Sequence, residues 1–153
     1  MKLLTAIDFS DITPRLLQHT KVLAKALNAE IYLIHVAEPN PDHIAYDYDP
    51  AAVYSIDPAE VRDSIAKRFQ HEHKTIQKYA EDLRSEDIRC TALMIQGEKV
   101  ELLVKEANRL QVDFIIAGTH GKGLISQVLL GSTSEELIRE SPVPVHLVPA
   151  EKD

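Results

Sequence analysis

Residues 114–133 read FIIAGTHGKGLISQVLLGST, and this stretch holds four of the five glycines in the chain. Its first four residues form an apolar run with the length of a buried strand. It ends by entering Ser132-Thr133-Ser134-Glu135, which is typical of a capping box at the start of a helix. In open α/β sheets, ligands bind beyond the carboxyl ends of the strands. The stretch therefore predicts an α/β fold with a glycine-rich connection between a strand and a helix.

The rest of the chain repeats this alternation. Four more apolar runs of strand length occupy residues 3–7, 31–36, 90–95 and 145–148. The first two are nearly continuous in apolar residues, as expected of strands covered on both faces. Alternating strands and helices imply right-handed crossovers and a parallel sheet with helices on both faces. No second domain or internal repeat is evident, so residues 1–153 are predicted to form a single domain.

Cap signals predict where the helices begin and end. Thr13 is predicted to be an N-cap, with Pro14 at the first helical position. Asp57-Pro58-Ala59-Glu60 predicts the start of a long charged helix that ends at about Ser85. A third helix is predicted over 98–110, and a fourth runs from the capping box to about Ser141. The buried stripe of the first helix is predicted to hold Leu16, Thr20, Leu23 and Leu27.

One stretch, residues 37–56, has no convincing period and contains three prolines. We expect a long surface loop or lid there, because loops of that length in compact domains are often functional. We also expect the single cysteine, Cys90, to pack in the core, since it lies in an apolar run.

The composition limits the partners and the compartment. Seventeen basic and twenty-four acidic residues give a net charge of −7, which argues against nucleic acid, because duplex binding uses basic patches. Backbone amides can still hold a small nucleotide. The absence of an apolar run of about 18 residues predicts no membrane insertion. With no signal-peptide pattern, the expected compartment is the cytoplasm.

The glycine-rich stretch also carries the candidate chemistry. Gly118 and Gly121 allow tight turns and a close approach of the backbone to a ligand. Gly131, Ser132 and Thr133 would place free amides and two hydroxyls at a helix N-terminus, where the dipole favours phosphate. Lys122 could add a charge-assisted hydrogen bond. The alternative is that these glycines only make turns and that Ser132 is only a cap. No Walker loop and no Gly-x-Gly-x-x-Gly run is present.

The spacing Gly118-x-x-Gly121, nine residues, then Gly131-Ser132 resembles the Gly-2x-Gly-9x-Gly-Ser/Thr pattern of the ATP-binding branch of the universal stress protein family. The resemblance extends to residues 6–11, 33–36 and 141–145, and is weakest over 38–88. It implies a Rossmann-like three-layer sandwich with a five-stranded parallel sheet in the order 3-2-1-4-5 and about four helices. It also implies ATP, with ADP or AMP as alternatives, and a bridging Mg or Mn ion.

The resemblance further implies roles for single residues. Asp8 would contact the adenosine end of the nucleotide, and the backbone at Val36 would meet the adenine. Gly118 and Gly121 would line the ribose and phosphates, and Gly131, Ser132 and Thr133 would hold the phosphate tail. The other candidate nucleotide-binding residues are Thr119, His120 and Lys122. The alternative for Asp8 is a turn or capping role at a strand end, and for Val36 it is plain core packing.

The expected function is that of a nucleotide-dependent regulatory module in a stress response, acting on an unknown protein partner. The resemblance implies a homodimer through residues 145–148, which would bring His146 near the interface. Because no set of catalytic residues is evident, catalysis is not the leading hypothesis, and no metal-ligating protein residues are proposed. One alternative is a slow ATPase or phosphotransferase assisted by Ser10, Ser132 or His120. Another is a dimer that acts through protein contacts without nucleotide.

Overall fold

The computed structural model describes residues 1–37, 58–119 and 131–150. All five predicted strands are present and form one parallel sheet in the order β3-β2-β1-β4-β5. The strands are β1 (Lys2–Ile7), β2 (Glu30–Ala37), β3 (Cys90–Gln96), β4 (Phe114–Gly118) and β5 (Val145–Val148). The predicted fold class and strand order are therefore confirmed.

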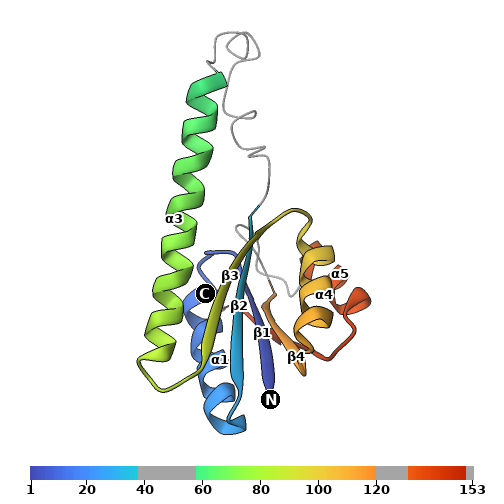
Figure 1. Ribbon diagram of the computed structural model, residues 1–153. Helices are drawn as coiled ribbons and strands as arrows, with labels where there is room; N and C mark the ends of the chain where they lie inside the picture. The colour runs from blue at the N-terminus through green and yellow to red at the C-terminus, as the bar shows by residue number, and fades with distance from the viewer. Residues whose placement is uncertain (38–57, 120–130, 151–153) are drawn as a thin grey trace.

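The helices of the described residues form two layers around this sheet (Figure 1). They are α1 (Thr13–Leu27), α3 (Pro58–Arg84), α4 (Lys99–Leu110) and α5 (Ser132–Glu140). Helices α1 and α3 cover one face and α4 and α5 the other, each pair over its own apolar core. None of the helices in the described part of the chain is long and apolar enough to cross a bilayer.

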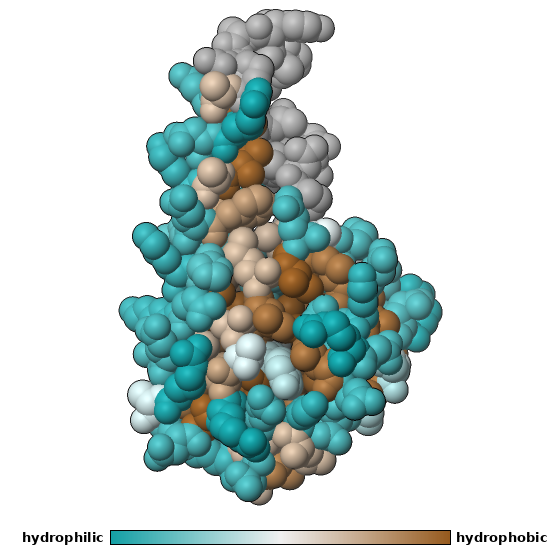
Figure 2. All heavy atoms as spheres, in the orientation of Figure 1, coloured by the Kyte–Doolittle hydropathy of each residue, from teal (hydrophilic) through white to brown (hydrophobic). Residues whose placement is uncertain are grey.

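Helix α3 has 27 residues, and its N-terminal half extends past the ends of the strands (Figure 1). Figure 2 shows hydrophilic side chains along its outer face and more apolar ones on the side toward the sheet. The C-terminal half carries the buried side chains Ile76, Ala80 and Leu83, spaced by three or four residues. The helix is thus anchored to the sheet by its second half.

Burial follows the position of each strand in the sheet. Leu3, Ile31 and Ile115, in β1, β2 and β4, have no exposed surface, because helices cover both faces of these central strands. The edge strand β3 is only partly buried. Cys90 at its start is half-buried and packs against the core under α1 and α3, close to the expected core position.

Three predictions about helix ends and faces are wrong. The N-cap of α1 is Ile12, not Thr13, and makes no side-chain capping bond. Gly131, not Ser132, is the N-cap of α5, again without a side-chain capping bond. On α1, Leu27 is 40% exposed, whereas Ala24 is buried. Each observed cap lies one residue before the predicted one, because the chain is already held there: the Thr13 amide bonds to the Ser10 carbonyl, and the Gly131 amide to the Thr119 carbonyl.

Candidate functional site

The carboxyl ends of β1, β2 and β4 meet at one end of the sheet, where a cavity opens between them and the N-termini of α4 and α5. Strand order reverses here: the chain leaves β1 for β2 on one side and leaves β4 for β5 on the other. Such a switch point is where α/β sheets bind ligands. The cavity is lined by Ala6, Ile7, Asp8, Ile12, Leu16, Ile34, Val36, Lys99, Leu103, Ala117, Gly118, Thr133, Ser134 and Leu137.

Asp8 directly follows β1 and shapes the turn into α1. Its Oδ1 accepts hydrogen bonds from the Ser10 amide at 3.0 Å and from the Ser10 hydroxyl at 2.5 Å. Phe9 between them has φ = 57°, a left-handed conformation that costs a bulky residue roughly 1–2 kcal/mol. The expected turn role of Asp8 is therefore present, and it uses one carboxylate oxygen. Among the described residues no hydrogen bond reaches Oδ2, and Asp8 lines the cavity.

Val36 lies near the end of β2, on the neighbouring side of the same cavity. The last pair between β1 and β2 is Ile7 with His35, whereas β2 continues beside β3 as far as Ala37. Among the described residues, Val36 and Ala37 therefore have no partner in β1, and Val36 lines the cavity at this point. The Val36 side chain is 5% exposed and packs in the core under α4 and α5, so the expected core packing is also present.

The junction between β4 and α5 closes the third side. The Gly131 amide donates to the Thr119 carbonyl at 3.1 Å, so it is not free, contrary to expectation. The Ser134 hydroxyl donates to the carbonyls of Gly118 at 3.0 Å and Thr119 at 3.3 Å. These bonds pin the first turn of α5 to the end of β4 across the intervening residues.

Within the part of the chain that the structure describes, three amides at this end of α5 have no hydrogen-bond partner. The first N–H groups of a helix have no partner within it, and Glu135 is the first residue here whose amide reaches back, to the Gly131 carbonyl at 3.0 Å. The amides of Ser132, Thr133 and Ser134 therefore point out of the helix start. The Ser132 and Thr133 side chains are exposed, and Thr133 lines the cavity. This is the anion-favouring end of the helix dipole.

Two groups at the cavity were missed by sequence reasoning. Lys99, the first residue of α4, lines the cavity and brings a cation to it. Ser134 was assigned only to a capping box, but its hydroxyl joins β4 to α5. A usable sequence signal for Lys99 was its position just after Gly97, a glycine that directly follows an apolar run of strand length. In the structure, Gly97 follows β3 with φ = 145°. A turn at that point places the start of α4 at the carboxyl end of the sheet.

His120, Gly121 and Lys122 lie outside the described residues. Asp8, Val36, Gly118 and Thr133 come together around the cavity, although they are spread over residues 8–133 of the chain. Within residues 1–37, 58–119 and 131–150, no three His, Cys, Asp or Glu side chains are placed to hold a metal ion.

With this geometry in place, the chain can be compared with known proteins. It is 29% identical over 152 residues to a universal stress protein of Thermus aquaticus, covering 95% of this chain and 96% of that protein. It is 28% identical over 154 residues to universal stress protein MJ0577 of Methanocaldococcus jannaschii, covering 96% and 93%. The solved structure of MJ0577 superposes with a TM-score of 0.76, 26% identity and coverage of 99% and 97%.

A more distant structure shares the fold. A universal stress protein family protein of Arabidopsis thaliana, solved with AMP bound, matches with a TM-score of 0.69 at 16% identity, covering 99% of this chain and 92% of that one. The sequence model of the universal stress protein family matches residues 1–149 of this chain. The chain therefore belongs to the universal stress protein family.

Proposed function

We propose that this protein binds an adenine nucleotide, with ATP as the leading candidate, at the carboxyl ends of β1, β2 and β4. The observation that carries the proposal is the convergence of Asp8, Val36, Gly118 and Thr133 on one cavity beside the free amides of α5. An apolar slot, a carboxylate and an anion-favouring helix start are the three features that a base, a ribose and a phosphate chain require.

The cavity would hold the adenosine end of the nucleotide. Its volume of about 120 Å³ is smaller than a complete ligand pocket of roughly 300–1,000 Å³, so it suits one part of a nucleotide. The walls at Ile34, Val36 and Ala117 are apolar, as a planar base prefers. The Oδ2 atom of Asp8 would accept hydrogen bonds from ribose hydroxyls.

The phosphates would lie at the start of α5. The amides of residues 132–134 and the Ser132 and Thr133 hydroxyls supply donors, and Lys99 supplies a positive charge at the same cavity. The family pattern adds Gly121, and we propose that Thr119, His120 and Lys122 contribute beside it. A Mg or Mn ion would neutralise part of the phosphate charge when bound. The AMP carried by the Arabidopsis relative supports an adenine nucleotide as the ligand class.

We propose a regulatory role rather than catalysis. Ser10, one of the candidate nucleophiles, is 7% exposed and its hydroxyl already donates to Asp8 in the turn. Incubation with labelled ATP and magnesium separates the readings, because phosphate release or labelled protein within hours would favour the slow ATPase or phosphotransferase. Hydrogen exchange with and without ATP tests the switch itself, and unchanged protection throughout the chain would contradict it. A role in a stress response, an unknown protein partner and a cytoplasmic location are further predictions.

The binding proposal has a direct test. Freshly purified protein is denatured and any released nucleotide is identified by mass spectrometry, and emptied protein is titrated with ATP and magnesium. Asp8→Asn should weaken binding roughly tenfold or more, because it replaces a charged acceptor at the ribose. Asp11→Asn is the matched control, since Asp11 is an exposed carboxylate of the same turn. No bound nucleotide and no titration would refute the proposal.

We further propose a homodimer through β5, which is an edge strand among the described residues. The amide of Ile115 donates to Pro144 and that of Thr119 to Val148. Successive residues of a strand direct their backbone N–H and C=O groups to opposite sides. Pro144 and Val148 bond on the β4 side, so the N–H and C=O groups of Val145 and Leu147 point away from it. Leu147→Pro should therefore weaken the dimer in sedimentation experiments more than Leu147→Ala, which keeps the N–H. Equal effects of the two variants, or a monomeric parent protein, would contradict this interface.

A further inference from the structure

A buried histidine connects the candidate site to helix α3. His35 in β2 is 7% exposed and points to the face that α1 and α3 cover. Its Nδ1 lies 2.9 Å from the Ile7 carbonyl oxygen. On the other side of the ring, Nε2 lies 3.5 Å from Oε2 of Glu72 in α3, within ion-pair distance. Both atoms are buried, and neither makes a hydrogen bond within the described residues. The Phe9 ring packs on the imidazole with centroids 4.3 Å apart.

The partners of this ring fix its protons. A carbonyl oxygen only accepts, so Nδ1 must carry a proton to make the bond to Ile7. Nε2 faces a carboxylate oxygen at ion-pair distance, so this approach is attractive only when Nε2 carries a proton. A neutral imidazole has a single N–H and can satisfy only one of the two partners. The arrangement is favourable on both sides only when His35 is the imidazolium ion.

Both contacts of His35 on the β1 side flank Asp8. The Ile7 carbonyl belongs to the Ile7–Asp8 peptide group, whose atoms are coplanar, so holding this oxygen fixes the direction in which the chain enters Asp8. The Phe9 ring, held against His35, fixes the direction in which the chain leaves it, in its left-handed conformation. His35 thus contacts the chain on both sides of Asp8.

We propose that His35 is a positioning residue for the nucleotide site, and that its ion pair with Glu72 couples nucleotide affinity to the docking of α3. The proposal rests on the binding function proposed above. When His35 is protonated, α3, the ring and the Asp8 turn are held together. When it is neutral, either the Ile7 bond or the Glu72 contact is lost, and Asp8 and α3 become independent of each other. By thermodynamic reciprocity, a nucleotide that needs the fixed Asp8 turn also strengthens the docking of α3.

The other groups around the pair fit this role. Arg68, one helical turn before Glu72, places its Nε 3.8 Å from Oε1 and shares that carboxylate. Arg68 also lies over the Phe69 ring, 5.0 Å from its centroid. The residue opposite His35 in β3 is Met94, which carries no charge. On the β1 side, the charged residue next to the Ile7 contact is Asp8. From α3, Tyr79 packs against Phe9 with ring centroids 6.4 Å apart.

Glu72→Gln gives a test that a purely structural contact would not pass. A glutamine amide donates to the unprotonated Nε2 of a neutral ring, while Nδ1–H keeps the Ile7 carbonyl, so this variant no longer needs the second proton. Titrations of ATP with magnesium between about pH 5.5 and 8.5, where imidazole groups change charge, compare it with the parent protein. The ratio of the two dissociation constants at each pH removes the protonation of the nucleotide itself.

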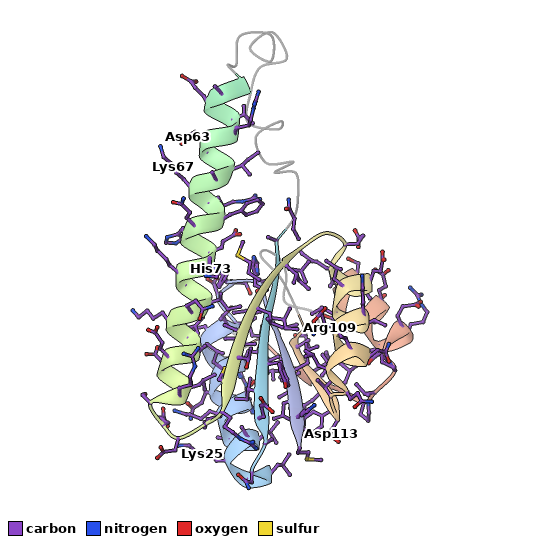
Figure 3. All side chains as sticks on the ribbon, viewed as in Figure 1. Lys25, Asp63, Lys67, His73, Arg109 and Asp113 are labelled. Atoms are coloured by element: carbon purple, nitrogen blue, oxygen red, sulfur yellow. The ribbon has the colours of Figure 1, made fainter. Side chains whose placement is uncertain are left out.

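We expect the parent protein to lose affinity relative to Glu72→Gln by about fivefold or more as the pH rises, within the usual range of allosteric coupling. Asp63→Asn is the control: it removes an exposed ion pair with Lys67 on the same helix, in the overhanging half (Figure 3), and should keep the parent's pH profile. A constant ratio of parent to Glu72→Gln across the range would overturn the proposal. If the parent binds no nucleotide at any pH, the binding function itself fails instead.

A second measurement needs no variant. In the parent protein, hydrogen exchange over residues 72–84 of α3 should slow on addition of nucleotide at about pH 6 and respond much less at about pH 8.5, after correction for intrinsic rates. Equal protection at both values, with nucleotide bound at both, would contradict the coupling even if Glu72→Gln did not fold.

Discussion

Replacing Ser134 by alanine should destabilise the protein, whereas replacing Ser132 should not. The Ser134 side chain is 6% exposed, and its hydroxyl donates to the Gly118 and Thr119 carbonyls. The Thr119 carbonyl keeps a second donor, the Gly131 amide. Removing the Ser134 hydroxyl therefore mainly affects the Gly118 carbonyl, which loses a hydrogen bond. A hydrogen bond contributes about 1 kcal/mol net, and a buried acceptor left unpaired costs about 1–3 kcal/mol. We therefore expect Ser134→Ala to cost about 1–2 kcal/mol.

Urea unfolding followed by circular dichroism measures this cost. With a slope of about 2 kcal/mol per molar urea, the midpoint should fall by roughly 0.5–1 M. Ser132→Ala is the matched control, because Ser132 is exposed and makes no capping bond, and its change should stay within about 0.5 kcal/mol.

The two variants also separate stability from binding. If the Ser132 hydroxyl contacts phosphate as proposed, Ser132→Ala weakens ATP binding while leaving the urea midpoint unchanged. The reasoning is refuted if Ser132→Ala destabilises as much as Ser134→Ala. That result would mean that Ser132 caps α5, as the local sequence alone suggests.

Three further predictions concern parts of the fold away from the cavity. The hydroxyls of Thr5 and Thr20, both fully buried, lie 3.2 Å apart. Each single change to valine should lower the free energy of unfolding in urea by about 1–3 kcal/mol, because it leaves the other hydroxyl unpaired. The double variant should lose less than the sum of the two single changes, and an additive loss would contradict the hydrogen bond. Burial raises the pKa of the Cys90 thiol from 9.0 to about 11, so alkylation at pH 8 should run about 100-fold slower in the folded protein than in urea, and equal rates would contradict a buried thiol. Hydrogen bonds from the Lys25 and then the Lys21 ammonium groups lower the pKa of Glu86, so the pair stabilises the fold above the ordinary pKa of 4.5 and less as the pH falls through the depressed value. Glu86→Gln should be less stable than the parent at pH 7 and equally stable in acid, and a stability difference that persists in acid would contradict this origin.

Much of the fold followed from local chemistry. The five apolar runs became the five strands, because their apolar side chains pack under the helices on the two faces of the sheet. The starts of α3 and α4 and the end of α5 also lie within a residue or two of the predicted positions. Strand order, by contrast, came from the family resemblance, since periodicity says that a strand is buried but not which strand lies beside it.

Local signals failed where two elements compete for the same turn. Thr13 followed by Pro14 has the chemistry of a cap, yet the helix begins one residue earlier, and the buried Thr13 hydroxyl has no hydrogen-bond partner in the described part of the protein. The Thr13 amide instead bonds to the Ser10 carbonyl at 2.9 Å, so the turn built by Asp8 decides where α1 starts. On the same helix, Ala24 is buried in the core under α1 and α3, whereas Leu27 is 40% exposed.

By itself, the sequence determined the number of strands, the alternation with helices, the glycine-rich connection after the fourth strand and Asp8 at the end of the first. These depend on polarity and backbone freedom over a few neighbouring residues. Only the tertiary structure decided that Lys99 joins the site, that Ser134 rather than Ser132 secures α5, and that His35 is held between Ile7 and Glu72. Those contacts join segments tens of residues apart, and a distance between two such atoms is set by how helices pack on the sheet, which no local pattern encodes.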